Sequence, residues 1–451
     1  MKNLQKTLIF LVIFLVLGAS VSALDGIGTK TNPFVIKTTE DYLFFAENVA
    51  AGDLGYTAAY VELVNCLDFT DKTFLPIGTK AAPFTGSFDG KGHALAGITY
   101  ETDSPCAGVF AYAKNAVITR LGVENASFTV NAQGETNAGI LCGELIAASG
   151  KTAGISRCYA TGSLAVETDG NLRAGGLVGV LKSTEADICA YVQDSYFAGR
   201  VDATGTLVYL GGIAGLATGD ASDAKLQITR SFSAGALSGV TTKLSTLSAQ
   251  EVYVGGIAGR LHKDESTSTP WLAATSDISD VFSLCELSAV YQKNPDKALR
   301  VSGICAAKMN GTVSNAYVAK SNAVCNLSAE DGTVTDAANF TSRTFLAGEL
   351  GFDLDAVWML AEGAETPFLR ETPCIEVRTG DAGAVYTAHG APYGVLLAVL
   401  YDEAGRVTAV RTAEKSLALV REAENAAARV FLLEKGTLRP LCAPVTVSAG
   451  A

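Results

Sequence analysis

The sequence predicts an all-β protein: a right-handed parallel β-helix (solenoid) of about six coils with an N-terminal capping helix, followed by a small β-sandwich. Three observations support this fold class. A glycine and aliphatic signature recurs through the middle of the chain, and 451 residues contain 46 glycines but only 11 prolines. The segments between its copies are β-rich and have no 3.6-residue period. The last stretch changes to separate short strands with turn signals, which is typical of a sandwich.

The composition limits the classes of protein and partner. With 48% apolar residues, 18% charged residues and a mean hydropathy of +0.26, the chain can bury a large core, which excludes a disordered protein. The 34 Lys and Arg residues against 46 Asp and Glu residues give a net charge of −12. Because phosphate binding needs clustered cations, we expect no nucleic-acid partner.

Residues 1–23 have the pattern of a secretory signal peptide. Lys2 and Lys6 precede the apolar run 8–17, and small residues at the end of the segment provide a cleavage site. The run is shorter than the roughly 20 residues of a membrane span, although an uncleaved anchor over 8–23 is the alternative. We therefore expect a secreted, extracellular chain, free or associated with the cell surface and without a transmembrane span. Cleavage removes two lysines and no acid, so the net charge changes from −12 to −14.

Residues 24–100 are expected to form the N-terminal cap and the first solenoid strands, because an open solenoid must cover its end strands. Thr38 followed by Asp41 resembles a capping box with Asp in place of Glu. The residues after them predict a helix over 39–51. Its apolar face is expected to consist of Leu43, Phe44, Ala46 and Val49.

Residues 101–340 carry the repeat. Its glycine copies lie 31 to 47 residues apart, as from Gly108 to Gly139 and from Gly256 to Gly303. A solenoid corner needs either a positive φ or a backbone approach without a Cβ, and glycine provides both. The second positions of the copies are Gly108, Gly139, Gly176, Gly212, Gly256 and Gly303.

A second signature follows each glycine copy: an aliphatic residue, two mostly polar residues, a small residue and usually an aromatic one, as from Ile155 to Tyr159. The number of residues between the two signatures varies from copy to copy, whereas the predicted strands keep a constant length. The polar insertions 263–270 and 291–298 should therefore project as loops from one side, where binding would most readily evolve.

These two signatures resemble GLUG repeats, which occur in bacterial surface and secreted proteins, including adhesin-like chains and the non-catalytic part of immunoglobulin A metallopeptidases. The resemblance covers about residues 30 to 370 and implies a repeat scaffold without the peptidase domain. Residues 84–93 resemble the segment that commonly precedes such repeats. Residues 350–353, 357–358 and 367–369 look like the usual closing segment. The repeat motifs themselves are 175–179, 211–215, 255–259, 158–162, 195–199 and 231–235.

Residues 341–372 are expected to close the solenoid, and residues 373–451 to form an immunoglobulin-like or fibronectin-like β-sandwich. Apolar residues at helical spacing predict a short helix over 342–357, with Trp358 packed beside it. Residues 402–405 are expected to be a hairpin turn. The predicted strands are 375–377, 384–388, 394–401, 407–410, 417–420, 429–433 and 445–447.

The chain is not expected to be an enzyme or to bind a cofactor or a metal. None of its three histidines begins a His-Glu-x-x-His motif, so the resemblance implies no peptidase activity. His93 is interpreted as part of a structural turn. A polysaccharide-active lyase or hydrolase is the alternative, and it would need clustered acids. Asp277 and Asp280 could lie near Asp194 across coils, but we expect solvated turn acids. The acids at turns are Asp89, Asp194, Asp220, Asp223, Asp277 and Asp280.

The ten cysteines favour buried positions rather than a functional site. By alignment of the copies, Cys158 matches Ser195 and Ser231, and Cys305 matches Ala258. Because there is no Cys-x-x-Cys motif, we expect no zinc or redox site, while one or two disulfides remain open.

The aromatic residues of the second signature provide the candidate binding site. If their rings face outward, they form a stack for sugar rings or an apolar partner, such as a host or bacterial surface glycan or protein. The alternative is a ladder that faces inward or is covered by a loop. We thus expect a non-catalytic adhesion or partner-binding scaffold, with a passive envelope spacer as a further alternative. The ladder residues are Tyr159, Tyr196, Phe232, Phe282 and Tyr317.

Overall fold

The computed structural model describes most of the chain from residue 24 onward. The described residues are 24–221, 224–242, 252–262, 275–291, 300–308, 311–320, 332–360, 365–370, 374–380, 383–389, 394–414, 416–420, 427–434, 438, 440 and 444–448. The predicted signal peptide lies outside them, as do both predicted insertion loops apart from Tyr291.

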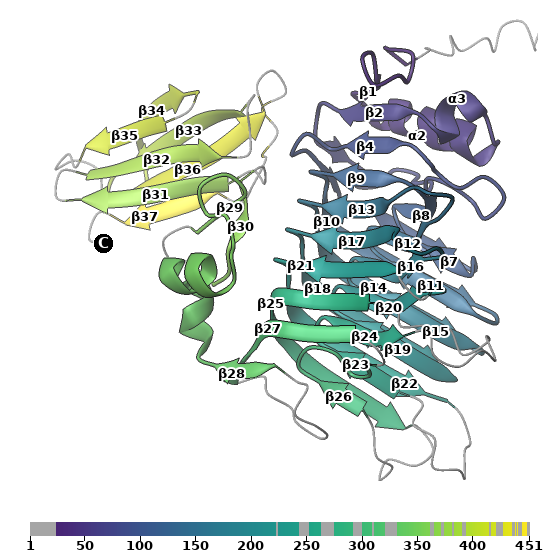
Figure 1. The fold of residues 1–451 in the computed structure, drawn as a ribbon. Helices are drawn as coiled ribbons and strands as arrows, with labels where there is room; N and C mark the ends of the chain where they lie inside the picture. The colour runs from purple at the N-terminus through teal and green to yellow at the C-terminus, as the bar shows by residue number, and fades with distance from the viewer. Residues whose placement is uncertain are drawn as a thin grey trace, which may run out of the picture.

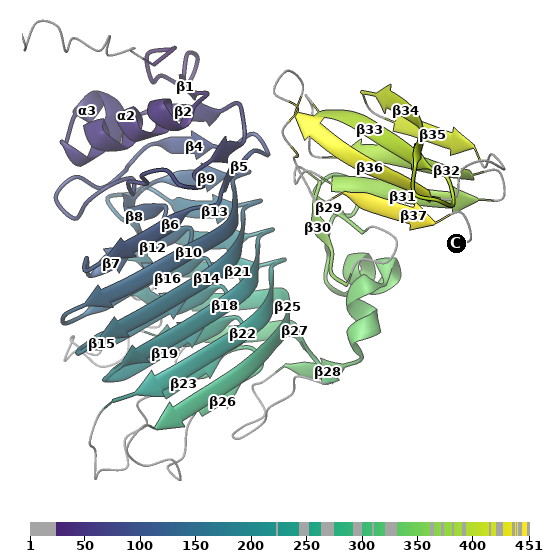
Figure 2. The same cartoon turned by 180° about the vertical axis from the view of Figure 1, so that it is seen from behind.

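The middle of the chain is a parallel β-solenoid, as predicted (Figure 1). Each complete coil contributes four consecutive strands, for example β13 (Ala153–Ser156), β14 (Tyr159–Thr168), β15 (Asn171–Gly175) and β16 (Val178–Ser183). Each strand pairs in parallel with the equivalent strand of the next coil, so four columns of strands run along the rod (Figure 2). Columns 1 and 2 together form the 17-stranded sheet.

The strands of the four columns follow in chain order. Column 1 contains β1 (Phe34–Ile36), β2 (Tyr60–Leu63), β4 (Ser87–Asp89), β9 (Val117–Thr119), β13, β17 (Cys189–Gln193), β21 (Lys225–Thr229), the first part of β25 (Thr275–Tyr291) and β27 (Gly311–Ala319). Column 2 contains β3 (Leu67–Asp68), β5 (Ala94–Ala96), β6 (Thr99–Thr102), β10 (Gly122–Ala132), β14, β18 (Tyr196–Gly205), β22 (Phe232–Thr241), the later parts of β25 and β27, and β28 (Thr333–Thr335). Column 3 contains β7 (Cys106–Ala107), β11 (Thr136–Gly139), β15, β19 (Leu207–Gly211), β23 (Val252–Gly255) and β26 (Arg300–Ser302). Column 4 contains β8 (Phe110–Lys114), β12 (Cys142–Ala147), β16, β20 (Ala214–Gly219) and β24 (Ala258–His262).

The stacked copies bury identical kinds of side chain at identical positions. The six strands of column 3 confirm about six coils. In column 1 the aliphatic residue of the second signature pairs from coil to coil, as from Ile155 to Val192 and Ile228, and all three side chains are fully buried. Since the side-chain period of a strand is two, this register fixes which face of each strand fills the core.

Glycine occupies the bend between columns 3 and 4 because the backbones of adjacent coils approach closely there. A Cβ on Gly175 would lie 2.0 Å from the carbonyl oxygen of Val178 and 2.9 Å from the amide nitrogen of Gly215 in the next coil. Of the two reasons expected for glycine, the absent Cβ therefore applies at this bend, since Gly175 is not among the residues with positive φ. The expected alignment of Gly139 with Gly176 is wrong by one residue: Gly139 pairs with Gly175.

A helix covers the first coil. Helix α2 (Thr39–Ala50) begins after Thr38, and the predicted capping box is present: the Thr38 hydroxyl accepts from the amide of Asp41, and the Asp41 carboxylate accepts from the amide of Thr38. The predicted apolar face is partly wrong, because Tyr42 and Phe45 are fully buried while Leu43 and Phe44 are only half-buried. The short helix α3 (Leu54–Thr57) follows.

The closing segment, residues 332–360, is less helical than predicted. It contains a 3₁₀-helix, η2 (Ala337–Thr341), and a single π-helical turn, η3 (Phe345–Glu349), instead of one helix over 342–357. Gly351 has φ of 61°, which ends the helical geometry. Trp358 lies in β29 (Trp358–Met359), which pairs with β30 (Phe368–Leu369), and it is fully buried.

The C-terminal module has all seven predicted strands in two antiparallel sheets. One sheet has the order β31–β32–β35 and the other β34–β33–β36–β37, which is a β-sandwich. The hairpin turn at Asp402 is confirmed: the Gly405 amide donates to the Asp402 carbonyl oxygen. The strands are β31 (Cys374–Gly380), β32 (Gly383–His389), β33 (Gly394–Tyr401), β34 (Val407–Ala413), β35 (Ser416–Val420), β36 (Ala427–Glu434) and β37 (Val445–Ser448).

The cysteines follow the predicted ladder positions. Cys305 lies beside Ala258 of the preceding coil, as expected. Seven described cysteines form no disulfide, and five of them are buried. They are Cys66, Cys106, Cys142, Cys158, Cys189, Cys285 and Cys305. Among the described helices, none has the length and apolar character to cross a membrane.

Candidate binding site

The five predicted ladder residues lie in column 2 in exact alignment from coil to coil. Tyr159 pairs with Tyr196, Tyr196 with Phe232, Phe232 with Phe282, and Phe282 with Tyr317. The first four rings stack nearly parallel, with centroids 5.2, 4.9 and 4.7 Å apart. They belong to a hydrophobic cluster separate from the solenoid interior, so the rings face outward.

The closing segment covers this ladder. Phe340 stacks on Phe282 at 4.4 Å, and Trp358 packs beside Tyr196 and Phe232 at 6.2 and 5.8 Å. As a result Phe232 and Phe282 are fully buried. Of the two alternatives, an open outward ladder and one that faces inward or is covered, the structure shows a covered ladder. A binding role for the five residues stays a prediction, and it would require the closing segment to leave the ladder.

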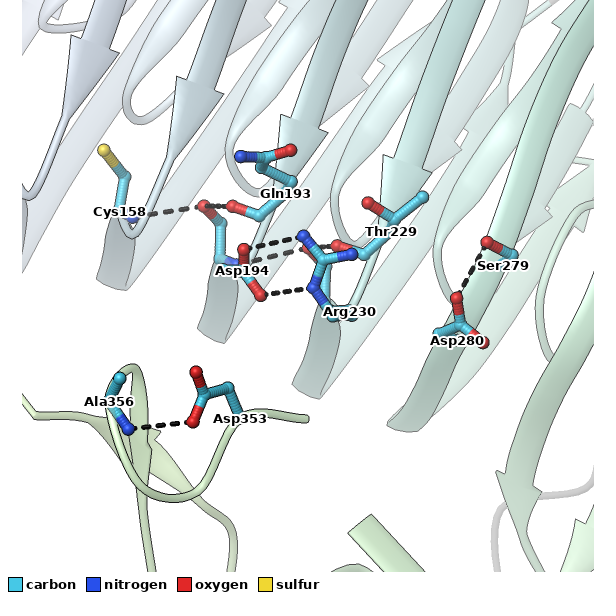
Figure 3. Close-up of polar contacts among 11 residues, drawn as sticks. Cys158, Gln193, Asp194, Thr229, Arg230, Ser279, Asp280, Asp353 and Ala356 are labelled. Atoms are coloured by element: carbon cyan, nitrogen blue, oxygen red, sulfur yellow. Dashed lines mark hydrogen bonds and ion pairs between the residues drawn. The ribbon is translucent and has the colours of Figure 1, made fainter. Parts of the chain in front are cut away.

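A column of left-handed residues lies immediately before the ladder, at the turn between columns 1 and 2 (Figure 3). Arg157, Asp194, Arg230, Asp280 and Asn315 all have φ between 45° and 57°. This conformation costs about 1–2 kcal/mol for a residue other than glycine. Hydrogen bonds between coils offset the cost, because the backbone amides of Arg157, Asp194 and Arg230 donate to carbonyl oxygens of the next coil, as from Asp194 to Thr229 at 3.1 Å.

This turn column holds an ion pair between Asp194 and Arg230. The Arg230 guanidinium donates twice to the Asp194 carboxylate, at 2.8 and 2.9 Å, and Asp194 is only 6% exposed. Asp280 lies beyond Arg230 on the same column, and its carboxylate accepts from the side-chain Nδ2 of Asn315 at 2.7 Å. The expectation of solvated turn acids is therefore wrong for Asp194, since a basic residue of the adjacent coil neutralises it.

The other predicted turn acids are also engaged or lie outside the described residues. Asp89 accepts from Arg120 Nε at 3.0 Å, and Asp220 forms an ion pair with Lys182 at 2.9 Å. Asp223 and the side chain of Asp277 lie outside the described residues. In the part of the chain that the structure describes, no three His, Cys, Asp or Glu side chains gather to hold a metal ion.

Small residues follow the turn column, which explains the equivalence of Cys158 with Ser195 and Ser231. The amide of Cys158 donates to Ser195 Oγ at 3.1 Å, and the amide of Ser195 donates to Ser231 Oγ at 3.2 Å. Ser195 Oγ in turn donates to the carbonyl oxygen of Gln193 at 2.7 Å. The hydroxyls thus satisfy buried amides that no strand partner reaches.

A second outward surface lies at the bend between columns 3 and 4, and sequence reasoning missed it. We call it the bend face, defined by the outward side chains of the two columns beside the glycine bend. From column 3 these are Asn137, Arg173, Tyr209, Tyr253 and Arg300, which are paired from coil to coil. From column 4 they are Glu144, Val180, Leu216 and Arg260.

Arginine and tyrosine interleave at one end of the bend face. The Arg260 guanidinium lies 5.1 Å from the Tyr209 ring centroid and 5.9 Å from that of Tyr253, and it donates to the Tyr209 hydroxyl. Arg300 lies 5.9 Å from the same Tyr253 ring. The Tyr253 ring therefore has two guanidinium groups against it, an arrangement that cation–π attraction stabilises. Tyr253 is half-buried and Arg300 is exposed, so both are accessible.

A polar cluster lies at the other end of the bend face. Arg173 Nη1 donates to Asn137 Oδ1 at 3.3 Å, and Asn137 Nδ2 donates to Glu144 Oε2 at 3.5 Å. Burial raises the pKa of Glu144, while the charges of Lys182 and Arg173 act in the opposite direction. The end of the bend face with Arg260 and Arg300 is therefore cationic, whereas the end with Arg173 and Glu144 carries charges of both signs.

The sequence did contain a signal for the bend face. Four of its five column 3 members stand two positions before the first glycine of their copy, as Tyr209 does before Gly211 and Tyr253 before Gly255. One strand residue stands between each of these members and its glycine, and that residue is buried. Because successive side chains of a strand point to opposite faces, the column 3 members face outward.

The fold has a counterpart of known structure. A crystal structure of a candidate immunoglobulin A1 protease from Bacteroides ovatus matches with a TM-score of 0.53 and 20% sequence identity, over 76% of this chain and 94% of that one. At this identity the match shows a shared fold. No family model and no curated protein matches the chain.

Proposed function

We propose that this protein is a secreted bacterial repeat protein of the GLUG type, which acts without catalysis and binds an acidic glycan on its bend face. The observation that carries the proposal is the placement of the accessible Tyr253 ring between Arg260 and Arg300. The proposal makes the solenoid a scaffold that repeats the same outward position at each coil.

The chemistry of the bend face fits a sugar chain with carboxylate groups. A tyrosine ring offers an apolar face to the C–H groups of a sugar and a hydroxyl to its polar groups. A guanidinium matches the two oxygens of a carboxylate with parallel hydrogen bonds. Successive coils place Tyr209, Tyr253 and Arg300 at about 4.8 Å intervals, the spacing of paired strands, which suits a linear polymer.

The charge of the bend face also favours an anionic ligand. Arg260 and Arg300 stand close together, against the same Tyr253 ring, on a chain whose net charge is −12. Such a local cationic site in an acidic protein attracts acidic polymers there and repels them elsewhere. The ion pairs of Asp89, Asp194 and Asp220 favour a binding role over a polysaccharide-cleaving one, which needs unpaired acids beside the substrate.

The experiment is binding of the mature chain, residues 24–451, to immobilised polygalacturonate and to neutral dextran. We expect binding to polygalacturonate alone, and at least a tenfold loss in the double variant Tyr253→Ala, Arg300→Ala. The matched control is Arg200→Ala, which removes an exposed arginine of column 2 that pairs with Asp202. Equal binding by the double variant, or equal binding to dextran, would contradict the proposal. Failure to bind any glycan would favour the spacer alternative.

A further inference from the structure

A second chemical site lies at the N-terminal end of the ladder column, away from the bend face. Cys66 precedes β3, and its neighbour Leu67 pairs with Leu95, which places Cys66 opposite Ala94. Ala94 pairs with Gly122, and Gly122 with Tyr159. Cys66 thus occupies the same column as the aromatic ladder, beyond the first ring, Tyr159.

The thiol of Cys66 contacts a titratable base. Its Sγ lies 3.7 Å from His93 Nδ1, and the backbone amide of Ala94 donates to the same sulfur at 3.4 Å. His93 is only 9% exposed, whereas Cys66 is half-buried. A neighbouring imidazole can take the proton of a thiol, and an amide N–H stabilises the thiolate that remains.

Other described cysteines have different surroundings. Burial raises the pKa of the thiols of Cys142, Cys189 and Cys285, which favours inert thiols. Cys106 and Cys305 donate to backbone carbonyl oxygens, which also favours the protonated form. Cys66 therefore differs from them by its contact with an imidazole.

Three further polar groups at this end of the column are Tyr159, Glu124 and Asp68. Tyr159 lies over Gly122, where a Cβ would meet its ring at 2.4 Å, and its hydroxyl donates to the Glu124 carboxylate at 2.5 Å. Asp68 is two residues from Cys66 and accepts from the Thr70 amide. The negative charges of Glu124 and Asp68 favour a protonated imidazole and oppose a thiolate. The reaction rate of Cys66 therefore has to be compared with and without His93 while both acids are present.

We infer that Cys66 and His93 form a reactive thiol site that exchanges with low-molecular-weight disulfides. His93 takes the proton of the Cys66 thiol, and the thiolate attacks one sulfur of the disulfide R–S–S–R. The new bond is Cys66 S–S–R, the disulfide bond of the reagent breaks, and the leaving thiolate receives the proton from His93. The products are a mixed disulfide on Cys66 and one free thiol R–SH, without any external oxidant.

The test is the reaction of the native mature chain with an aromatic disulfide, 5,5′-dithiobis(2-nitrobenzoate), followed by peptide mass spectrometry to locate the modified cysteine. We expect Cys66 to react first, and faster than Cys189 at pH 7. His93→Ala is expected to slow the reaction of Cys66 about tenfold at pH 7, because the thiolate fraction falls.

Cys189 is the matched control, since it is also half-buried but has no contact with a histidine that the structure describes. It should react slowly in both proteins. The inference is overturned if Cys66 of the wild-type protein reacts no faster than Cys189, a result that needs no variant to fold. It is also overturned if a folded His93→Ala variant keeps the wild-type rate. Neither outcome bears on glycan binding, which is measured separately.

Discussion

Replacing Gly211 by alanine tests whether the glycines at the bend are required by the approach of neighbouring coils. Gly211 ends β19, directly before the bend into β20. An alanine Cβ there would lie 2.1 Å from the carbonyl oxygen of Ala214, 2.8 Å from Ala258 Cα and 2.8 Å from Gly259 N. All three are backbone atoms, and the last two belong to the next coil. No side chain can rotate away, so the coils themselves must separate.

The expected loss of stability follows from this geometry. An added methyl group costs about 1–3 kcal/mol where a core can shift, and here two backbones must shift, so we expect a loss of about 3 kcal/mol or more. Urea unfolding of the mature chain, followed by circular dichroism, measures it. Gly348→Ala is the matched control, because its Cβ would meet nothing within 4 Å. If Gly211→Ala unfolded at the wild-type urea concentration, close approach would not explain the glycine.

Three further predictions concern the ion pair, the covered ladder and the bend face. Asp194→Ala should destabilise the protein by about 2 kcal/mol, because the guanidinium of Arg230 loses its partner. The loss is not larger because a third of the Arg230 side chain is exposed to water. Additive effects of Asp194→Ala and Arg230→Ala in a double-mutant cycle would refute the pairing. Trp358→Ala should cost about 3–5 kcal/mol and increase binding of the dye ANS as the ladder is uncovered, and unchanged dye binding would contradict the covering role. Burial raises the pKa of Glu144, so stability is lost as the pH rises through the folded-state value. Glu144→Gln should therefore raise Tm relative to wild type at pH 7 but not at pH 4, and equal effects at both pH values would contradict this.

The repeat itself could be predicted from sequence because stacking imposes it. Each coil must present an aliphatic residue at the same buried position, so Ile155, Val192 and Ile228 recur at matching places. The capping box at Thr38 was likewise visible, since its chemistry is local. The partner of Gly139 could not be predicted, because the copies at Gly139 and Gly176 differ in length by one residue. Only the strand pairing between coils fixes the register.

The candidate sites depended on contacts between distant segments. The ladder from Tyr159 was found by spacing, but its cover comes from Phe340 and Trp358, and no local pattern states what they pack against. The bend face escaped notice because Tyr253 and Arg260 lie on opposite sides of a glycine bend, and their convergence depends on the angle of that bend. The ion pair of Asp194 with Arg230 requires knowing that two turn residues one coil apart stack.

Calorimetric titration with carboxylated and neutral sugars tests the central claim, recognition of carboxylates by the bend face, most directly. The mature chain is titrated with an oligogalacturonate and with a neutral glucose oligomer of the same length. We expect a Kd at least tenfold lower for the acidic oligomer, and about a tenfold weakening in Arg300→Lys, which keeps the charge but loses the paired donors. Equal Kd values for the two oligomers, or an Arg300→Lys variant that binds as the wild type does, would contradict the claim.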